Sequence, residues 1–198
     1  MAQAEAAATE SKRARNQAAR RQRVIEAAVE LASDGGYDAV QMRDVAGRAD
    51  VALGTLYRYF PSKDDLLIAA LAEQVTALQR RLAQKPPRGG TSADRVVDVL
   101  RRASRALERE PRLTAALVTA LSSPDPSVAE SKQQVYDILG SVIAAADGDA
   151  LSQGEGVVRV LGHVWFAALV SWVGGMAPTG QMGDDLEVAA RLILERQD

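Results

Sequence analysis

Two short helical patterns, joined by a tight polar turn, occupy residues 39–67, AVQMRDVAGRADVALGTLYRYFPSKDDLL. In residues 42–49 the apolar side chains recur at steps of three and four, which predicts a helix with one buried face. Residues 49–52 then form a turn, and residues 53–60 form a second helix with an apolar inner face and a polar edge. Two helices in this order predict a helix-turn-helix, whose second helix can enter the major groove of duplex DNA.

The predicted DNA contacts gather around the second of these helices. Base edges are reached from the amino end of such a helix, where Gly54 allows close approach and Thr55 can hydrogen-bond a base or touch a thymine methyl group. Aromatic and basic side chains farther along are expected to bind phosphates, whereas Gln41 and Arg43 can reach backbone or base. Arg43 could instead form a surface ion pair with a neighbouring aspartate. The predicted contacts are Arg20, Arg21, Gln41, Arg43, Leu53, Gly54, Thr55, Tyr57, Arg58, Tyr59 and Lys63.

Charge is distributed unevenly along the chain, whose formal net charge is only -2. Residues 15–23 are rich in arginine and contain no acid, so they can neutralise phosphates in an interaction that weakens as salt rises. A solvated tail is the alternative for this basic segment. Residues 1–11 are rich in alanine and lack large apolar side chains, which predicts a disordered arm.

The helix-turn-helix residues resemble the TetR family of bacterial one-component repressors. The resemblance is carried by residues 42–46, MRDVA, and residues 54–63, GTLYRYFPSK, at the family's spacing. Asp50 departs from the family, which usually has glycine in the turn, but aspartate tolerates a left-handed backbone better than most residues. The resemblance implies a helix-turn-helix DNA-binding domain at 12–60, followed by a ligand-binding and dimerisation domain at 61–198.

Composition and patterning independently favour an all-α fold. The chain has 198 residues, of which 47% are hydrophobic, and this is enough for a sizeable core. Its long Ala, Leu, Val and Arg segments rarely alternate with the period of two that a half-buried strand needs. Ser62 and either Thr91 or Ser92 are expected to cap helices at their amino ends. We predict about nine helices, near residues 12–35, 42–49, 53–60, 62–84, 92–110, 111–121, 128–146, 152–173 and 184–196.

A second group of residues is expected to enclose a hydrophobic effector. Its members are mostly apolar with few hydrogen-bonding groups, as in hydrophobic ligand pockets, although core packing could also explain them. Segment 35–63, and more loosely segments 109–121 and 164–173, resemble the TetR-type repressors of sterol catabolism in actinobacteria. This implies that a sterol-derived CoA thioester releases the operator, with Arg102, Arg105 or Arg109 as hypothetical partners of its phosphates. The predicted pocket residues are Leu100, Ser104, Leu107, Leu117, Leu121, Tyr136, Leu139, Trp165, Leu169 and Trp172.

The last two predicted helices carry a candidate dimer interface. Small and apolar side chains fall on one narrow arc of each helix, which allows close helix approach, although core packing alone could account for any of them. The resemblance implies a homodimer, and a dimer would read a near-palindromic operator with half-sites about 34 Å apart. The predicted interface residues are Val160, Val164, Ala167, Ser171, Ala189, Ala190 and Ile193.

Rival functions receive little support from the residue types. The sequence has one histidine and no cysteine, and it shows no nucleophile beside a base, no glycine-rich phosphate loop and no set of metal ligands. We therefore expect no catalytic residue, metal or cofactor. Residues 160–183 lack formal charge, but the glycines and proline within 174–180 interrupt them, so we expect no membrane span and a cytoplasmic location. A regulator answering another acyl ligand, or a DNA-binding protein without effector control, is the alternative.

Overall fold

The computed structural model describes the backbone of residues 2–147 and 155–194, and the side chains of residues 12–146 and 156–194. Within these ranges the regular structure is helical, which confirms the predicted all-α fold. The elements are α1 (Ala2–Ala39), α2 (Met42–Arg48), α3 (Leu53–Tyr59), α4 (Lys63–Gln84), α5 (Ser92–Glu108), α6 (Pro111–Leu121), a 3-10 helix (Pro126–Val128), α7 (Ala129–Asp147), α8 (Glu155–Val173) and α9 (Gln181–Leu194).

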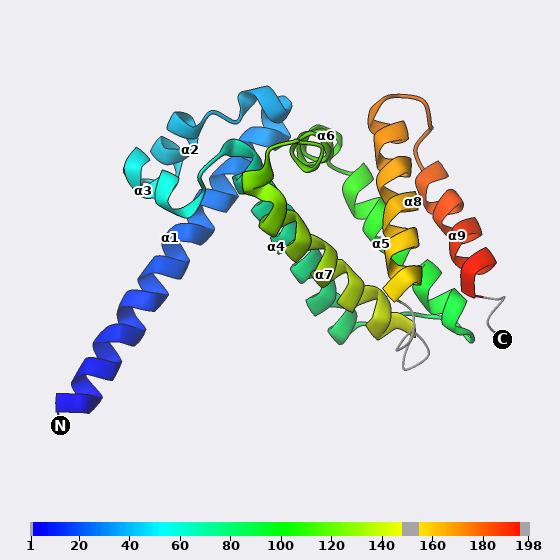
Figure 1. Cartoon of the computed structure of the whole chain (residues 1–198), viewed down its shortest axis with the longest axis horizontal. Coiled ribbons are helices and arrows are strands. Elements are labelled where there is room, and N and C mark those ends of the chain that lie inside the picture. Colours follow the sequence, from blue (N-terminus) through cyan, green and yellow to red (C-terminus); the bar gives the residue numbers. More distant parts are fainter. Residues whose placement is uncertain (1, 148–154, 195–198) are drawn as a thin grey trace.

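Helices α1 to α3 form one end of the molecule, and α4 leads from this end into the larger helical part (Figure 1). Val24 of α1, Val45 of α2 and Leu56 of α3 are fully buried, and Phe60, directly after α3, is 1% exposed. This shared core confirms the inner faces predicted from apolar spacing for the helix-turn-helix, except at Leu53, which the spacing also placed on the inner face and which is 36% exposed. Because the core fixes one side of α3, the other side of that short helix is turned outward.

Helix α1 differs from its predicted bounds at its amino end. At the carboxyl end, Gly36 is non-helical, with φ 73° and ψ -161°, and it separates the main helix from a last turn that reaches Ala39. Glycine adopts such positive φ values freely, so the predicted helix stop is confirmed. At the amino end, α1 begins at Ala2 rather than near residue 12 and projects away from the rest (Figure 1). The disordered arm over 1–11 stays a prediction.

Asp50 lies in the turn of the helix-turn-helix with φ 51°, the left-handed conformation expected there. No other non-glycine residue in the described part of the chain has a positive φ. The turn is closed by backbone hydrogen bonds from the amide of Val51 to the carbonyl of Ala46 (3.0 Å) and from the amide of Asp50 to the carbonyl of Gly47 (3.3 Å). This turn sets the relative orientation of α2 and α3.

Substituting Asp50 tests how strongly this turn depends on a residue that tolerates positive φ. We expect Asp50→Ala to lower the free energy of unfolding by about 1 kcal/mol, because the alanine Cβ is strained there without a compensating polar side chain. Asp50→Gly should be at least as stable as the parent, since glycine has no Cβ. Urea unfolding followed by circular dichroism measures both. Equal stability of the alanine and glycine variants would contradict the role given to the turn.

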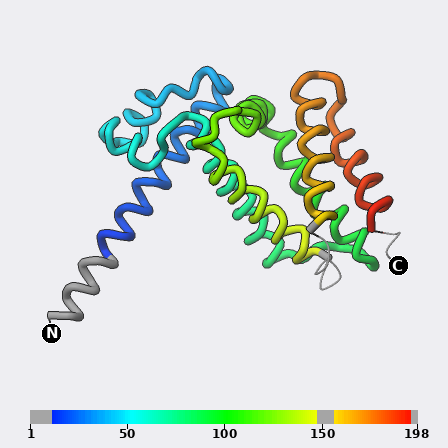
Figure 2. The backbone as a smooth tube through the Cα atoms, in the orientation of Figure 1, coloured from blue at the N-terminus to red at the C-terminus, as the bar shows by residue number. Residues whose placement is uncertain are grey.

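The larger part of the molecule consists of two groups of helices. Helices α4 and α7 lie side by side in one group, while α5, α8 and α9 pack together in the other, and α6 lies at the end next to α1 (Figures 1 and 2). Helix α6 also packs directly against α1. The larger part is therefore joined to the helix-turn-helix through both α4 and α6.

Two helix starts follow the predicted capping chemistry. The Ser62 hydroxyl accepts a hydrogen bond from the amide of Asp65 at 3.1 Å. Thr91 accepts from the amide of Asp94 at 3.1 Å, and the Asp94 carboxylate accepts from the amide of Thr91 at 3.2 Å, which completes a capping box. These hydrogen bonds from Thr91 hold the pKa of Asp94 below its ordinary value. Helix α9 begins at Gln181, slightly before its predicted start, and the predicted start of α8 at 152 lies outside the described residues.

Candidate DNA-reading surface and effector cavity

The amino end of α3 presents the predicted base-contacting residues to solvent. Leu53 is 36% exposed and Tyr57 is 47% exposed. Gly54 and Arg58 are exposed, and Thr55 is half-buried. A Cβ added to Gly54 would meet no other atom within 4 Å, so the space outside this residue is open. Leu53, Gly54, Thr55, Tyr57 and Arg58 together form what we call the reading face.

The basic residues near the reading face differ in how they are held. The Arg21 guanidinium lies 5.1 Å from the ring centroid of Phe60 and 3.6 Å from the carboxylate of Glu73 in α4. Arg21 therefore braces α1 against α4 in addition to any phosphate contact. Arg20 and Arg43 are exposed. No ion pair of Arg43 is found among the described side chains, so the alternative pairing with an aspartate is not seen.

Lys63, predicted to bind a phosphate, is engaged with Tyr37 at the end of α1. Its ammonium lies 3.6 Å from the centroid of the Tyr37 ring and donates a hydrogen bond to the Tyr37 carbonyl at 3.2 Å. The Tyr37 hydroxyl in turn donates to the carboxylate of Asp64 at 2.5 Å. Burial, together with this bond to Asp64, raises the pKa of Tyr37 to about 12. These contacts tie the first turn of α4 to the end of α1.

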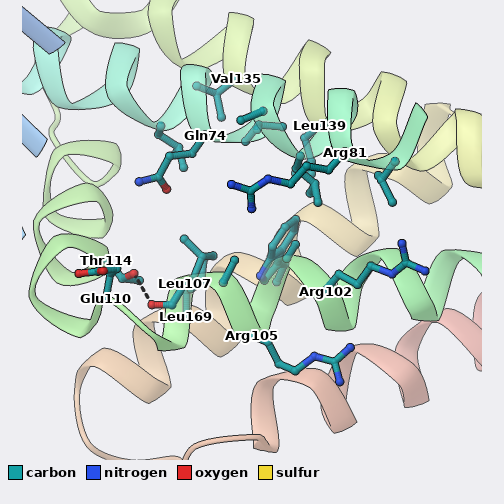
Figure 3. Close-up of a pocket in the computed structure, with 18 of the residues that line it drawn as sticks. Gln74, Arg81, Arg102, Arg105, Leu107, Glu110, Thr114, Val135, Leu139 and Leu169 are labelled. Carbon is teal, nitrogen blue, oxygen red and sulfur yellow. Dashed lines mark hydrogen bonds between the residues drawn. The ribbon is translucent and has the colours of Figure 1, made fainter. Parts of the chain in front are cut away.

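A cavity of about 770 Å³ lies between α4 and α7 on one side and α5 and α8 on the other, with α6 at one end (Figure 3). Leu107, Leu121, Tyr136, Leu139, Trp165 and Leu169, all predicted pocket residues, line it. Four others do not. Leu100, Ser104 and Leu117 are buried in the surrounding core, and Trp172 is half-buried outside the wall.

Helix α4 supplies a wall of the cavity that the predicted pocket lacked. Leu71, Val75, Leu78 and Leu82 line the cavity from this helix, and Gln74 stands among them. Apolar side chains at this spacing mark one face of a helix, and spacing alone does not distinguish a core face from a cavity wall. The polar Gln74 among these apolar residues was the one feature of the sequence that could have indicated a cavity wall on this helix.

Basic side chains surround the cavity at several points. Those that line it are Arg81, Lys85, Arg88, Arg102, Arg105 and Arg109. The Arg102 guanidinium already has partners within the protein, because it pairs with Asp98 at 2.5 Å and donates to the carbonyls of Lys85 and Pro86 at 2.9 Å and 3.3 Å. It therefore fixes the loop between α4 and α5. The side chains of Lys85 and Arg88 in that loop have no hydrogen bond or ion pair within the described part of the chain.

An apolar face on α8 and α9 is left uncovered in the single chain. Val160 is 44% exposed on α8, and Val188 and Leu192 are 58% and 61% exposed on α9. Of the predicted interface residues, Val160 and Ala167 are exposed, whereas Val164, Ser171, Ala189 and Ile193 are half-buried. Ala190 is fully buried, because that side of α9 packs into the core. Val188 and Leu192, which are also exposed on α9, were not among the predicted interface residues. We call Val160, Ala167, Val188 and Leu192 the apolar face.

Residues Gly156–Val173 of α8 are long and apolar enough to cross a membrane by length and composition alone. One third of this window (33%) is buried inside the protein, against the neighbouring helices of the bundle. The exposed side of the helix also carries Arg159 and His163. Core packing on one side and the apolar face on the other account for this composition.

Comparison with known proteins identifies the family. Residues 89–193 match the tetracyclin repressor-like C-terminal domain, and residues 24–70 match the bacterial regulatory proteins of the tetR family. The chain belongs to the TetR family. The transcriptional repressor KstR of Mycobacterium tuberculosis is 38% identical to this TetR protein over 181 residues, which cover 90% of this chain and 82% of KstR.

Two solved TetR structures extend this likeness to the fold. A TetR transcriptional regulator from Rhodococcus sp. RHA1 has a TM-score of 0.85 and 32% identity, with 92% of this chain and 100% of that chain covered. Thermus thermophilus FadR, a TetR-family repressor solved with lauroyl-CoA, has a TM-score of 0.71 and 25% identity, with 88% and 93% covered. The relatives are named as transcriptional repressors, and this TetR protein is accordingly a transcriptional regulator. The side chains that the structure describes contain no cluster of three or more metal-ligating residues.

Proposed function

We propose that this TetR-family repressor is a homodimer that leaves a near-palindromic operator when a sterol-derived CoA thioester fills its cavity. The observation that carries the proposal is the cavity of about 770 Å³, with mostly apolar walls and cationic side chains around it. Segments 35–63, 109–121 and 164–173 resemble the TetR-type repressors of sterol catabolism, the chain is 38% identical to the repressor KstR, and FadR was solved with lauroyl-CoA. Residues 12–60 would bind DNA in the cytoplasm, and residues 61–198 would bind the effector and the second copy.

The apolar face supports the homodimer. Val188 and Leu192 leave more than half of their surface in water in the single chain, at 58% and 61% exposed, and Val160 lies on the neighbouring helix. Removing such side chains from water on association is favourable at about 25 cal/mol per Å² of apolar area. A two-fold pairing of α8 and α9 with the same helices of a second copy gives a four-helix interface. Two reading faces are then held at a fixed separation.

Helices α4 and α6 supply the link from cavity to reading face. Gln74 of α4 and Thr114 of α6 line the cavity. The first turn of α4 holds Tyr37 of α1, and Arg112 of α6 donates to the carbonyl of Asp34 in α1 at 2.7 Å. An effector that spreads these helices therefore displaces α1 and the reading face with it. Such an effector must bind the DNA-incompetent arrangement more tightly, and a few kcal/mol of difference is enough.

The loop between α4 and α5 supports a CoA thioester over an uncharged lipid. Lys85 and Arg88 line the cavity with unpaired side chains, and Arg81 reaches from α4 into the cavity (Figure 3). Phosphates of CoA are natural partners for such cations. Arg102, one of the partners suggested from the sequence, instead holds the loop in place. Arg105 extends from α5 away from Arg81 (Figure 3). Arg109 also lines the cavity but follows the carboxyl end of α5, the opposite end of that helix from the loop, so the phosphates are assigned to Arg81, Lys85 and Arg88.

Operator release tests this proposal once the operator has been selected from a random DNA pool. A sterol-acid CoA thioester should release labelled operator, followed by fluorescence anisotropy, at a concentration at least about tenfold lower than CoA alone or the free sterol acid. For the double variant Lys85→Ala, Arg88→Ala, the thioester concentration that releases the operator should rise at least about tenfold, because each charge-assisted hydrogen bond contributes about 1.5–3 kcal/mol. Its response to the free acid should not change.

Arg80→Ala is the matched control, since Arg80 is exposed on α4 and does not line the cavity. Release by a straight-chain acyl-CoA but not by the sterol thioester would identify the protein as a regulator of another acyl ligand. Failure of every CoA thioester to change operator affinity would point to a DNA-binding protein without effector control.

A further inference from the structure

Gln74 is an uncharged amide placed in an otherwise apolar part of the cavity wall. It is half-buried on α4, with Leu71, Val75 and Leu78 around it in the same wall. Its amide extends into the cavity on the side where Thr114 and Glu110 lie (Figure 3). Within the described part of the chain no hydrogen bond of this side chain is found, so its donors and its acceptor are open to a ligand.

The two polar side chains that share this side of the cavity with Gln74, Thr114 and Glu110, offer acceptors to a ligand rather than donors. The Thr114 hydroxyl is 1% exposed and donates its hydrogen to the carbonyl of Leu107 at 2.8 Å, so it can only accept from a ligand. Glu110 is exposed, and an ionised carboxylate also only accepts. Of these three groups, only the Gln74 amide can donate to a ligand ketone, which has no hydrogen of its own to donate. Trp165 Nε1 and Arg109 are further donors in the cavity wall.

We propose that Gln74 hydrogen-bonds an oxygen at the end of the effector remote from the thioester, and that it selects oxygenated sterol thioesters over hydrocarbon-ended ones. The inference rests on the proposed function, whose effector it specifies further. Filling the cavity removes water from the Gln74 amide, and a desolvated amide without a partner is costly. A hydrocarbon end leaves this amide unpaired, whereas a ketone accepts from it and a hydroxyl can either donate to it or accept from it.

The distance along α4 fits such a two-ended ligand. Gln74 and Lys85 are separated by eleven residues (85 minus 74), which corresponds to about 16 Å along a helix. A sterol ring system with its side chain has a comparable length. In a sterol acid thioester the CoA group is on the side chain and the ring oxygen is at the opposite end. Because the pantetheine arm of CoA separates the thioester from the phosphates, a sterol group that reaches Gln74 has its thioester near the loop that contains Lys85. The phosphates then lie beyond the thioester, at the exposed side chains of Lys85 and Arg88.

A pair of ligands and one near-isosteric variant test the assignment. The probes are CoA thioesters of one sterol acid, with and without a ketone on the ring farthest from the thioester, and binding is measured by titration calorimetry. The parent protein should bind the ketone form about tenfold more tightly, as expected for a hydrogen bond whose absence leaves a buried amide unpaired. Gln74→Met should lose this preference, because it binds the ketone form more weakly and the hydrocarbon-ended form more tightly once no amide is left unpaired.

Gln84→Met is the matched control, because it makes the same substitution at an exposed position of α4 that does not line the cavity. It should keep the preference. Equal binding of the two thioesters by the parent protein would overturn the role of Gln74 and leave the proposed function intact, and this comparison does not depend on any variant folding. Failure of both thioesters to bind the parent would instead overturn the proposed function, and the role of Gln74 with it.

Discussion

Aspartate in place of Leu192 will leave a folded monomer whose operator affinity is lower by about a hundredfold or more. Leu192 is 61% exposed in the single chain and belongs to the apolar face with Val160 and Val188. In a two-fold pairing the same substitution occurs on both copies, so two carboxylates enter one apolar interface. Burying an unpaired charge costs several kcal/mol. Light scattering after gel filtration measures the mass, and fluorescence anisotropy measures operator affinity.

Ala83→Asp is the control for this substitution, because it adds the same charge at an exposed position of α4 outside the cavity and the apolar face. It should remain a dimer with full operator affinity. At a concentration low enough to dissociate the parent dimer, the Leu192→Asp variant and the parent protein should have the same melting temperature. The side chain at position 192 is exposed to water in the single chain, so the substitution does not disturb the core. A dimeric Leu192→Asp protein that still binds the operator would show that α8 and α9 do not form the interface.

The rotation of α9 shows what sequence reasoning could not supply. Apolar spacing predicted that Ala189, Ala190 and Ile193 share a side of the helix, but it assigned that side to a partner copy. In the structure Ala190 is fully buried. Ion pairs from Arg101 of α5 to Asp184 (2.9 Å) and to Glu187 (2.5 Å) help to fix the rotation of α9. Because Arg101 is far from α9 in the sequence, no local pattern reveals these ion pairs, and the exposure of Leu192 was not predicted.

Features that depend on neighbouring residues were predictable. The cap at Ser62, the helix stop at Gly36 and the left-handed turn at Asp50 each arise from one residue and the backbone within a few positions. The cavity was predicted in part, because Trp165 and Leu139 lie on helices rich in large apolar residues. The wall from α4 was not, since a cavity wall and a core face show the same periodicity and only packing distinguishes them.

Alanine in place of Gly54 should separate folding from DNA binding at the reading face. The added Cβ meets no atom within 4 Å, and Gly54 lies inside α3, so the variant should be as stable as the parent or more stable by about 0.5–1 kcal/mol. On the operator the new methyl group occupies space that a base edge or sugar approaches. A loss of about 1.4 kcal/mol at each half-site lowers the affinity of a dimer about a hundredfold.

Gly47→Ala provides the comparison, because Gly47 is an exposed helical glycine of α2 with equally open space around its missing Cβ. Both variants gain the helix propensity of alanine, so a difference between them reports on contact rather than on folding. We expect Gly47→Ala to bind the selected operator within about threefold of the parent, since α2 supports α3 and does not read bases. If Gly54→Ala also retains parental affinity, the amino end of α3 does not approach the DNA closely, and the reading face must lie elsewhere on the helix-turn-helix.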